Sequence, residues 1–340
     1  MSNQPLITRI ASIICFSCAV VFLDATPASA QSYWTGGGSG ASTRWDSGGN
    51  WLGGSRPGTG ATVIFNYRNG TGTIVSPMAM RRSFDWSTIT FSNLLGRLPT
   101  TLDINTDDGG TTARILTLSG GINLADTMTT VRFNANNFGA LSIVMSNNNT
   151  FSTSLGSTLI LNPVISGGFG LTKTGAGTMV LGGANTYTGL TTINGGTLRY
   201  ATNNAIAASG VTVNSTGTLA LNGFSDSVGQ VIIDGGSITG GGTLTSTAAF
   251  DARSGSSSAI LAGSVGLNKS TAGTFTLSAA NAYTGQTTIN AGTLAYGANN
   301  AIANGGVTVN STGTLAINGF NDTVGQVIVD GGSITGTGGT

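Results

Sequence analysis

Val211–Leu219 has the sequence VTVNSTGTL, and the same nine letters return 96 positions later as Val307–Leu315. The duplication extends well beyond this stretch, because the two copies align without a gap from Ile165 and from Leu261 onward. Self-similarity at a fixed period is the sequence signature of a solenoid, in which each repeat stacks on its neighbour. The chain is therefore expected to form an elongated coil.

A shorter period lies inside the long one. Polar residues recur every 20 positions at predicted bends: Thr174, Asn194, Asn214 and Asp234 in the first copy, and Ser270, Asn290, Asn310 and Asp330 in the second. An alternating apolar run such as Val211–Val213 precedes each bend, and this alternation turns one side of a strand inward. Asn, Asp and Gly supply the left-handed or tight-turn conformations that corners need. We predict an all-β coil of parallel strands with about 20 residues per turn, so one 96-residue unit holds about five turns and roughly 24 Å of axis.

The differences between the copies agree with this arrangement. Apolar residues replace each other at positions expected inside, and polar residues replace each other at positions expected outside. The inward pairs are Leu221/Ile317 and Ile233/Val329, and the outward pairs are Ser225/Asn321 and Ser227/Thr323. Changes that conserve volume inside and vary freely outside are what a packed core permits.

Residues 1–30 are predicted to be a secretory signal peptide. Arg9 gives a positive start, Ile10–Leu23 is an apolar stretch too short for an ordinary membrane span, and Ala28–Ala30 is a small-x-small cleavage site before Gln31. No other segment is long and apolar enough to cross a membrane as a helix. Both cysteines lie within the signal, so the exported chain must hold together without disulfides.

The region 31–88 differs from the rest because it contains all four tryptophans: Trp34, Trp45, Trp51 and Trp86. A solenoid needs its first turn covered, and large rings can cover it. We predict an irregular N-terminal cap here, with an aromatic platform for stacking sugars as the alternative.

The remaining chain divides into three predicted regions. Residues 89–164 read as irregular turns of the coil, residues 165–260 as the first repeat copy, and residues 261–340 as a truncated second copy. In the irregular region we expect strands at Ile115–Leu118, Leu141–Val144 and Thr158–Leu161, and turns at Ser119–Gly121 and Ser146–Asn149. About fifteen turns would result if the N-terminal half coils as tightly as the repeats.

Lys173–Leu198 has the sequence KTGAGTMVLGGANTYTGLTTINGGTL, and Lys269–Leu294 is similar except at Ser270–Ala272. This motif closely resembles the passenger-associated transport repeat, also called the autotransporter-associated β-strand repeat. The resemblance implies a right-handed parallel β-helix passenger that type V secretion carries to the surface of a Gram-negative-type bacterium. It also implies that the repeat aids transport, that the chain is not an enzyme, and that its partner is an outer-membrane β-barrel translocator. No segment reads as that barrel and the sequence ends inside a repeat, so we expect a fragment of a longer protein or a truncated reading frame.

Composition excludes several kinds of chemistry. The chain has no histidine and no glutamate, and no cysteine follows the signal, so Ser-His-Asp, Cys-His and His-based metal sites are excluded. Charges are few and nearly balanced, which excludes a basic footprint for nucleic acid. No catalytic, cofactor-binding or metal site is predicted, and no cofactor.

Four weaker patterns have structural alternatives. The scattered aspartates Asp226, Asp234, Asp322 and Asp330 lie at or near predicted bends, whereas a polysaccharide lyase would need clustered acids. Asp103–Gly109 resembles the start of a calcium loop, but Asp108 and Arg114 stand where Gly and Glu are required, so an exposed turn is favoured. A row formed by Thr178, Thr197 and Thr218 could order water or ice, although Thr is also a favoured strand residue. Asn194 and Asn214 are expected to form an internal, stabilising amide ladder.

These observations favour a non-enzymatic, exported passenger that acts at the cell surface or after secretion as a structural or adhesion module. The alternative is a secreted carbohydrate-active β-helix, either a polysaccharide lyase or a sugar-binding protein. Host or matrix glycans and proteins stay open as partners.

Overall fold

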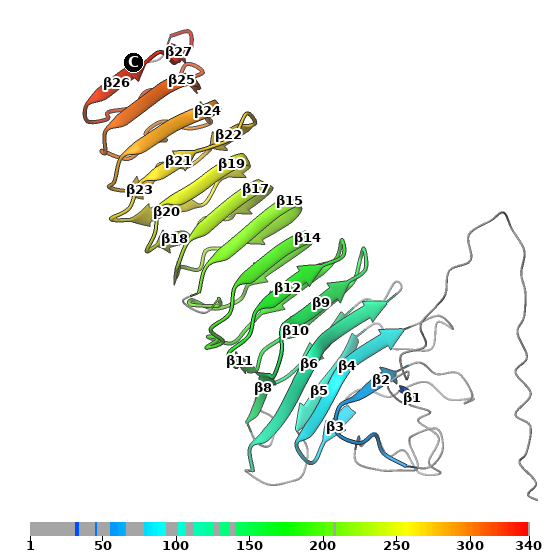
Figure 1. Cartoon of the computed structure of the whole chain (residues 1–340). Coiled ribbons are helices and arrows are strands. Elements are labelled where there is room, and N and C mark those ends of the chain that lie inside the picture. Colours follow the sequence, from blue (N-terminus) through cyan, green and yellow to red (C-terminus); the bar gives the residue numbers. More distant parts are fainter. Residues whose placement is uncertain are drawn as a thin grey trace, which may run out of the picture.

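The computed structural model of the chain is built from β-strands alone (Figure 1). It describes residues 31–33, 45, 55–65, 78–92, 101–106, 112–125, 130–135, 140–206 and 209–338. Within these ranges the strands stack into a parallel solenoid of about ten turns, with about 20 residues per turn. The predicted fold class is confirmed, and the right-handed sense of the coil stays a prediction. The described residues hold no helix that could cross a membrane, and the predicted signal, residues 1–30, lies outside them.

Most of the strands belong to one sheet that winds around the coil, and every pairing between its strands is parallel. Its members are β1 (Gln31–Tyr33), β2 (Ala61–Phe65), β3 (Met78–Met80), β4 (Phe84–Ser92), β5 (Thr101–Thr106), β6 (Arg114–Ala125), β7 (Thr130–Phe133), β8 (Leu141–Met145), β9 (Asn149–Thr153), β10 (Thr158–Leu161), β11 (Val164–Ser166), β12 (Leu171–Thr174), β13 (Thr178–Leu181), β14 (Thr191–Tyr200), β15 (Val211–Ala220), β17 (Val231–Thr239), β19 (Phe250–Ser257), β21 (Leu267–Lys269), β22 (Thr274–Leu277), β24 (Thr287–Tyr296), β25 (Val307–Ala316), β26 (Val327–Asp330) and β27 (Ser333–Thr335). A second parallel sheet lines another side of the coil and consists of β16 (Asp226–Val228), β18 (Thr243–Ser246), β20 (Ile260–Gly263) and β23 (Ala282–Tyr283).

The turns of the coil are wider near the N-terminus than in the duplicated region. Strand partners on successive turns are 32 residues apart at Phe84 and Leu116, and 28 apart at Thr130 and Thr158. From Thr158 to Thr178 the separation falls to 20. The N-terminal half therefore coils with fewer and wider turns than the repeats. About ten turns replace the fifteen that a constant 20-residue period would give.

Several of the predicted bends, among them Asn194, Asn214 and Asp234, are corners inside long strands. β14 runs through its corner, and its pairing with β15 shifts register between Ile193 and Gly195. A strand changes direction without leaving its sheet when the pairing skips a residue. The same device operates at Ser119–Gly121, where we expected a turn: β6 continues through this point, with Gly121 at a φ of 119°. Left-handed asparagines occur at other corners, namely at Asn204, Asn222, Asn300 and Asn318.

Apolar side chains of successive turns stack in columns inside the coil. Ile193, Val213 and Ile233 are register partners, and none has exposed surface. Burying each such side chain contributes about 1.5–3 kcal/mol, and the column repeats this gain at every turn. Leu221 is buried as predicted, whereas Val329, also predicted inside, is 50% exposed. No further turn of the described chain covers β26, so its side chains face solvent.

Large rings fill the interior of the first turns. Trp45 stacks on Trp86 with ring centroids 5.1 Å apart and lies 5.0 Å from the Phe65 ring. Both tryptophans are buried, so neither can serve as the exposed sugar platform considered above. Trp34 and Trp51 lie outside the described residues. β2 and β4 pair within the same sheet as β6, while the extent of the cap, residues 31–88, stays a prediction.

Candidate functional site

Each repeat copy places a lysine in the interior of the coil. Lys173 lies on β12, is fully buried, and donates from Nζ to the carbonyl oxygens of Thr174 (2.7 Å), Gly175 (2.9 Å) and Gly195 (3.1 Å). An ammonium group has three donors, so these three carbonyls satisfy it completely. Gly195 belongs to the next turn, and the lysine therefore ties two turns together at their corner.

The second copy repeats this contact. Lys269 is also fully buried and donates to the carbonyl oxygens of Thr271 and of Ala291, the latter at 3.1 Å and one turn further on. Burial lowers the pKa of Lys173 to about 8 and lowers that of Lys269, where the charge of Asp251 opposes the shift. Lowered lysine pKa values occur at catalytic sites, but both Nζ atoms are enclosed by backbone carbonyls. The two lysines thus act as interior corner caps.

A buried amide joins three consecutive turns. Asn185 accepts a hydrogen bond at Oδ1 from the backbone N–H of Ile165 (2.7 Å) and donates from Nδ2 to the carbonyl of Ala205 (2.6 Å). One turn later the carboxylate of Asp226 continues the series by accepting from the backbone N–H of Ile206 (2.9 Å). We call this series of side chains the interior staples.

The second copy contains the same interior staples. Asn281 links the backbone of Leu261 (2.8 Å) to that of Ala301 (2.6 Å), and Asp322 accepts from Ile302 N–H (2.8 Å). Buried backbone groups that lack a strand partner need a side chain to pair with them. The staples meet this need on the side of the coil where the strands are short.

A buried tyrosine and a glycine complete each motif. Tyr187 Oη lies 2.6 Å from Thr191 Oγ1, and its copy Tyr283 lies 2.9 Å from Thr287 Oγ1. Gly189 passes so close to the preceding turn that a Cβ there would overlap the backbone of Gly170. The Lys, Asn, Tyr and Gly residues that characterise the motif therefore all have roles in packing or hydrogen bonding inside the coil.

Tyr200 is buried near Asp226, the carboxylate of the interior staples. Burial raises the pKa of Tyr200 strongly, and the neighbouring Asp226 charge raises it further. Burial also raises the pKa of Asp226, although hydrogen bonds from the N–H groups of Ile206 and Ser227 oppose this. A phenol and a carboxyl enclosed in this way can stabilise the interior but cannot reach a substrate.

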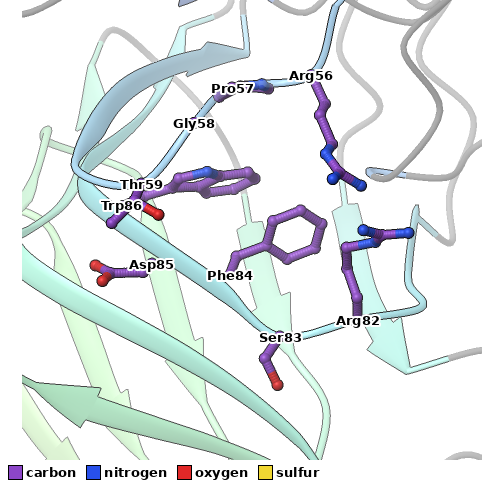
Figure 2. A pocket seen from close by; sticks show the side chains of 9 residues that line it. All are labelled: Arg56, Pro57, Gly58, Thr59, Arg82, Ser83, Phe84, Asp85 and Trp86. Atoms are coloured by element: carbon purple, nitrogen blue, oxygen red, sulfur yellow. The ribbon is translucent and has the colours of Figure 1, made fainter.

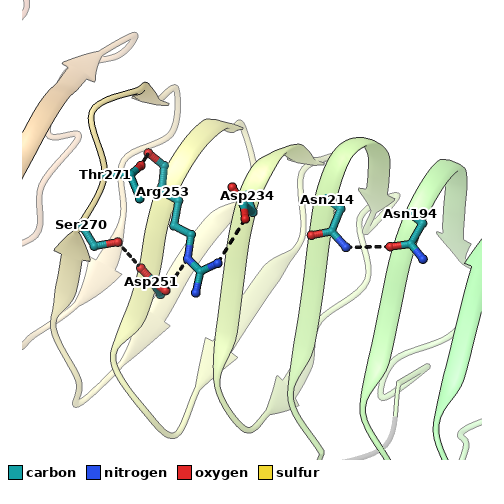
Figure 3. Close-up of polar contacts among 7 residues, drawn as sticks. All are labelled: Asn194, Asn214, Asp234, Asp251, Arg253, Ser270 and Thr271. Atoms are coloured by element: carbon teal, nitrogen blue, oxygen red, sulfur yellow. Dashed lines mark hydrogen bonds and ion pairs between the residues drawn. The ribbon is translucent and has the colours of Figure 1, made fainter.

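The other predicted aspartates do not come together. Asp234 is 3.1 Å from Arg253, which also pairs with Asp251 at 2.8 Å, and Ser270 donates to Asp251 (Figure 3). Asp330 is exposed on β26. The described residues contain no group of three or more acidic, histidine or cysteine side chains that could hold a metal ion.

The first part of the calcium-loop pattern lies on a strand. The exposed turn predicted at Asp103–Gly109 is wrong for Asp103–Thr106, which belong to β5 (Thr101–Thr106), while Asp107–Gly109 are outside the described residues. Alternation explains the strand, because Leu102 and Ile104 face inward and Asp103 faces outward. Asp103 pairs with Arg132 at 2.9 Å on β7.

The two predicted ladders exist, and the amide ladder lies outside the coil. Asn214 Nδ2 donates to Asn194 Oδ1 at 2.7 Å, but this contact is exposed (Figure 3), so the expectation of an internal ladder was wrong. Thr178, Thr197 and Thr218 are register partners on successive turns. Thr218 also lies within 3.2 Å of the Ser237 hydroxyl.

The sequence reasoning missed Lys173 and Asn185 as interior residues. The available signal for Lys173 was its inward phase, two residues after Leu171 in the alternation of β12. Exposed asparagines at the corners, such as Asn194 and Asn214, also recur every 20 residues. Spacing alone therefore does not distinguish inward-facing from outward-facing positions.

Residues 171–199 and 267–295 both match the family model described as the passenger-associated-transport-repeat, which confirms the resemblance. A segment of 54 residues, 15% of the chain, is 50% identical to a protein of Brucella suis biovar 1 (strain 1330) described as "Adhesin BmaC autotransporter". The aligned segment covers only 2% of that adhesin's length. No solved structure matches the chain.

Proposed function

We propose that this chain is a non-enzymatic autotransporter passenger, exported through its N-terminal signal and displayed at the cell surface or released from it. It serves there as a structural or adhesion module. One observation supports the proposal most strongly: in both transport repeats, the Lys, Asn and Tyr side chains of the motif form hydrogen bonds inside the coil. The adhesion role is supported by the similarity to an autotransporter adhesin.

The interior staples suggest how the repeats aid transport. Each staple bonds one turn to the next, so a turn gains its full stability only when its neighbour is folded against it. An unfolded chain emerging from an outer-membrane β-barrel translocator would therefore be held outside as each new turn joins the folded coil. On this proposal the motif is a folding device, and the barrel is the partner of the chain.

Surface display tests the proposal. The chain is joined upstream of an autotransporter barrel, and protease accessibility of the passenger is measured on intact cells. The double variant Asn185→Leu/Asn281→Leu should reduce the accessible folded passenger several-fold, while the exposed-ladder control Asn194→Leu/Asn290→Leu should not. Equal display of both variants would show that the staples do not assist transport.

The carbohydrate-lyase alternative is not favoured by any contact. Asp226 lies in the interior, Asp234 is paired with Arg253, and the aspartates of the described residues are not gathered at one groove. Binding of a sugar without chemistry is a separate question, considered next.

A further inference from the structure

Positive charge is concentrated in the N-terminal part of the sequence. Residues 31–100 contain six arginines and two aspartates, a formal charge of +4, whereas residues 101–340 contain six cationic and nine acidic residues, a charge of −3. Two of these arginines, Arg56 and Arg82, line a surface hollow of about 200 Å³. Its walls are the segment Arg56–Thr59, just before β2, and the segment Arg82–Trp86, which enters β4.

The two arginines converge across this hollow. Figure 2 shows their guanidinium ends turned toward one another beside the Phe84 ring, while the Asp85 carboxylate points the other way. Both arginines are exposed, and neither forms an ion pair with a residue that the structure describes. Converging like charges repel each other. An anion between them would remove the repulsion and accept hydrogen bonds from both planar forks.

The rest of the hollow suits a sugar ring. The rings of Phe84 and Trp86 lie 4.5 Å apart beneath the hollow and are almost fully buried, so they support its base, while the hydroxyls of Thr59 and Ser83 on the walls are the groups that would contact a sugar. At about 200 Å³ the hollow is smaller than the ~300 Å³ lower limit of drug-sized pockets, so it fits one ring with its charged substituent.

We propose that this hollow binds one acidic residue of a polysaccharide, with the carboxylate of a uronate or the sulfate of a sulfated sugar held between Arg56 and Arg82. The proposal rests on the adhesion role proposed above and is independent of the transport role. A nucleic acid is disfavoured, because it would need a basic stripe along the molecule, and the coil beyond residue 100 carries net negative charge.

The test uses the full chain and calorimetric titration with defined saccharides. Trigalacturonate and a sulfated trisaccharide are the acidic probes, the methyl ester of trigalacturonate is the neutral one, and inorganic phosphate is the simple anion. We expect at least one acidic probe to bind, and the neutral ester to bind at least tenfold more weakly than trigalacturonate if trigalacturonate binds. Arg56→Ala and Arg82→Ala should each weaken acidic-probe binding about tenfold or more, with weaker binding at higher salt.

Three further variants sharpen the result: Arg56→Ala/Arg82→Ala, Arg56→Lys/Arg82→Lys and Arg199→Ala. Arg56→Lys/Arg82→Lys keeps the charge but loses the planar forks, so its affinity should fall between those of wild type and the double alanine variant. Arg199→Ala, which removes an exposed arginine of β14, should bind like wild type. Binding of neither acidic probe, or equal binding by wild type and the double alanine variant, would overturn the proposal.

Competition by inorganic phosphate and the surface-display assay distinguish the remaining outcomes. If inorganic phosphate competes as strongly as the saccharides, the hollow is a general anion site and the sugar assignment is wrong. If surface display is unaffected by the staple variants while saccharide binding follows Arg56 and Arg82, only the transport role fails.

Discussion

Replacing Asn185 with leucine probes the interior staples directly. The Asn185 side chain is almost fully buried and bridges Ile165 N–H at 2.7 Å and the Ala205 carbonyl at 2.6 Å. Leucine has the same branching but no polar atom, so one buried N–H and one buried C=O lose their partner. Each unpaired group destabilises a fold by about 1–3 kcal/mol. We therefore expect Asn185→Leu to lower the free energy of unfolding by about 2–6 kcal/mol.

Urea unfolding followed by far-UV circular dichroism measures this loss, and hydrogen exchange locates it. In a solenoid each turn contacts only its neighbours, so faster exchange should be concentrated in residues 165–206. The control Asn194→Leu removes an amide of the exposed ladder and should change stability by about 0.5–1 kcal/mol at most. If both variants unfold at the same urea concentration, with the same exchange pattern, the interior amide is not a staple.

Gly189→Ala should destabilise the coil by about 1–3 kcal/mol or more, because the added Cβ would overlap the Gly170 backbone. Gly168→Ala is the control, since a Cβ there would meet nothing within 4 Å. Equal thermal stability of the two variants would contradict the close packing of turns. Burial lowers the pKa of Lys173 from 10.5 to about 8, so the unfolded chain binds more protons than the folded chain between these values. Wild-type stability should consequently rise from pH 8 to 9.5 by up to about 2 kcal/mol relative to Lys173→Met, and a parallel pH dependence of both proteins would argue against a buried ammonium. N-terminal sequencing of the exported protein should begin at Gln31, and retention of the first 30 residues would count against the signal peptide.

The periodicity of the sequence predicted most of the fold. The 20-residue spacing of Asn194 and Asn214 predicted the tight turns, and the alternation around Val211–Val213 predicted which side faces inward. The wider early turns were not predictable in this way, because residues 89–164 lack a repeated residue that marks each turn. The corners were also misjudged as breaks, since a bulge within a strand and a turn between strands use the same Gly-rich sequences.

The polar interior could be predicted only in part. Asn185 and Asn194 are the same residue type, nine positions apart, and one is buried while the other is exposed. The difference depends on where the backbone leaves a donor or acceptor unpaired, which is a property of three stacked turns and not of local sequence. The Arg56–Arg82 hollow was likewise invisible, because the two arginines are distant in sequence and meet only when β2 and β4 pair.

Deletion of one complete repeat copy tests the central claim, a linear coil stabilised turn by turn. Removing residues 165–260 joins Val164 to Leu261, the residue equivalent to Ile165 in the second copy. Small-angle X-ray scattering should show a rod of unchanged cross-section that is about 24 Å shorter, since five turns are lost at ~4.8 Å each. Loss of the β-sheet signal, or a maximum dimension equal to that of the full chain, would contradict the account.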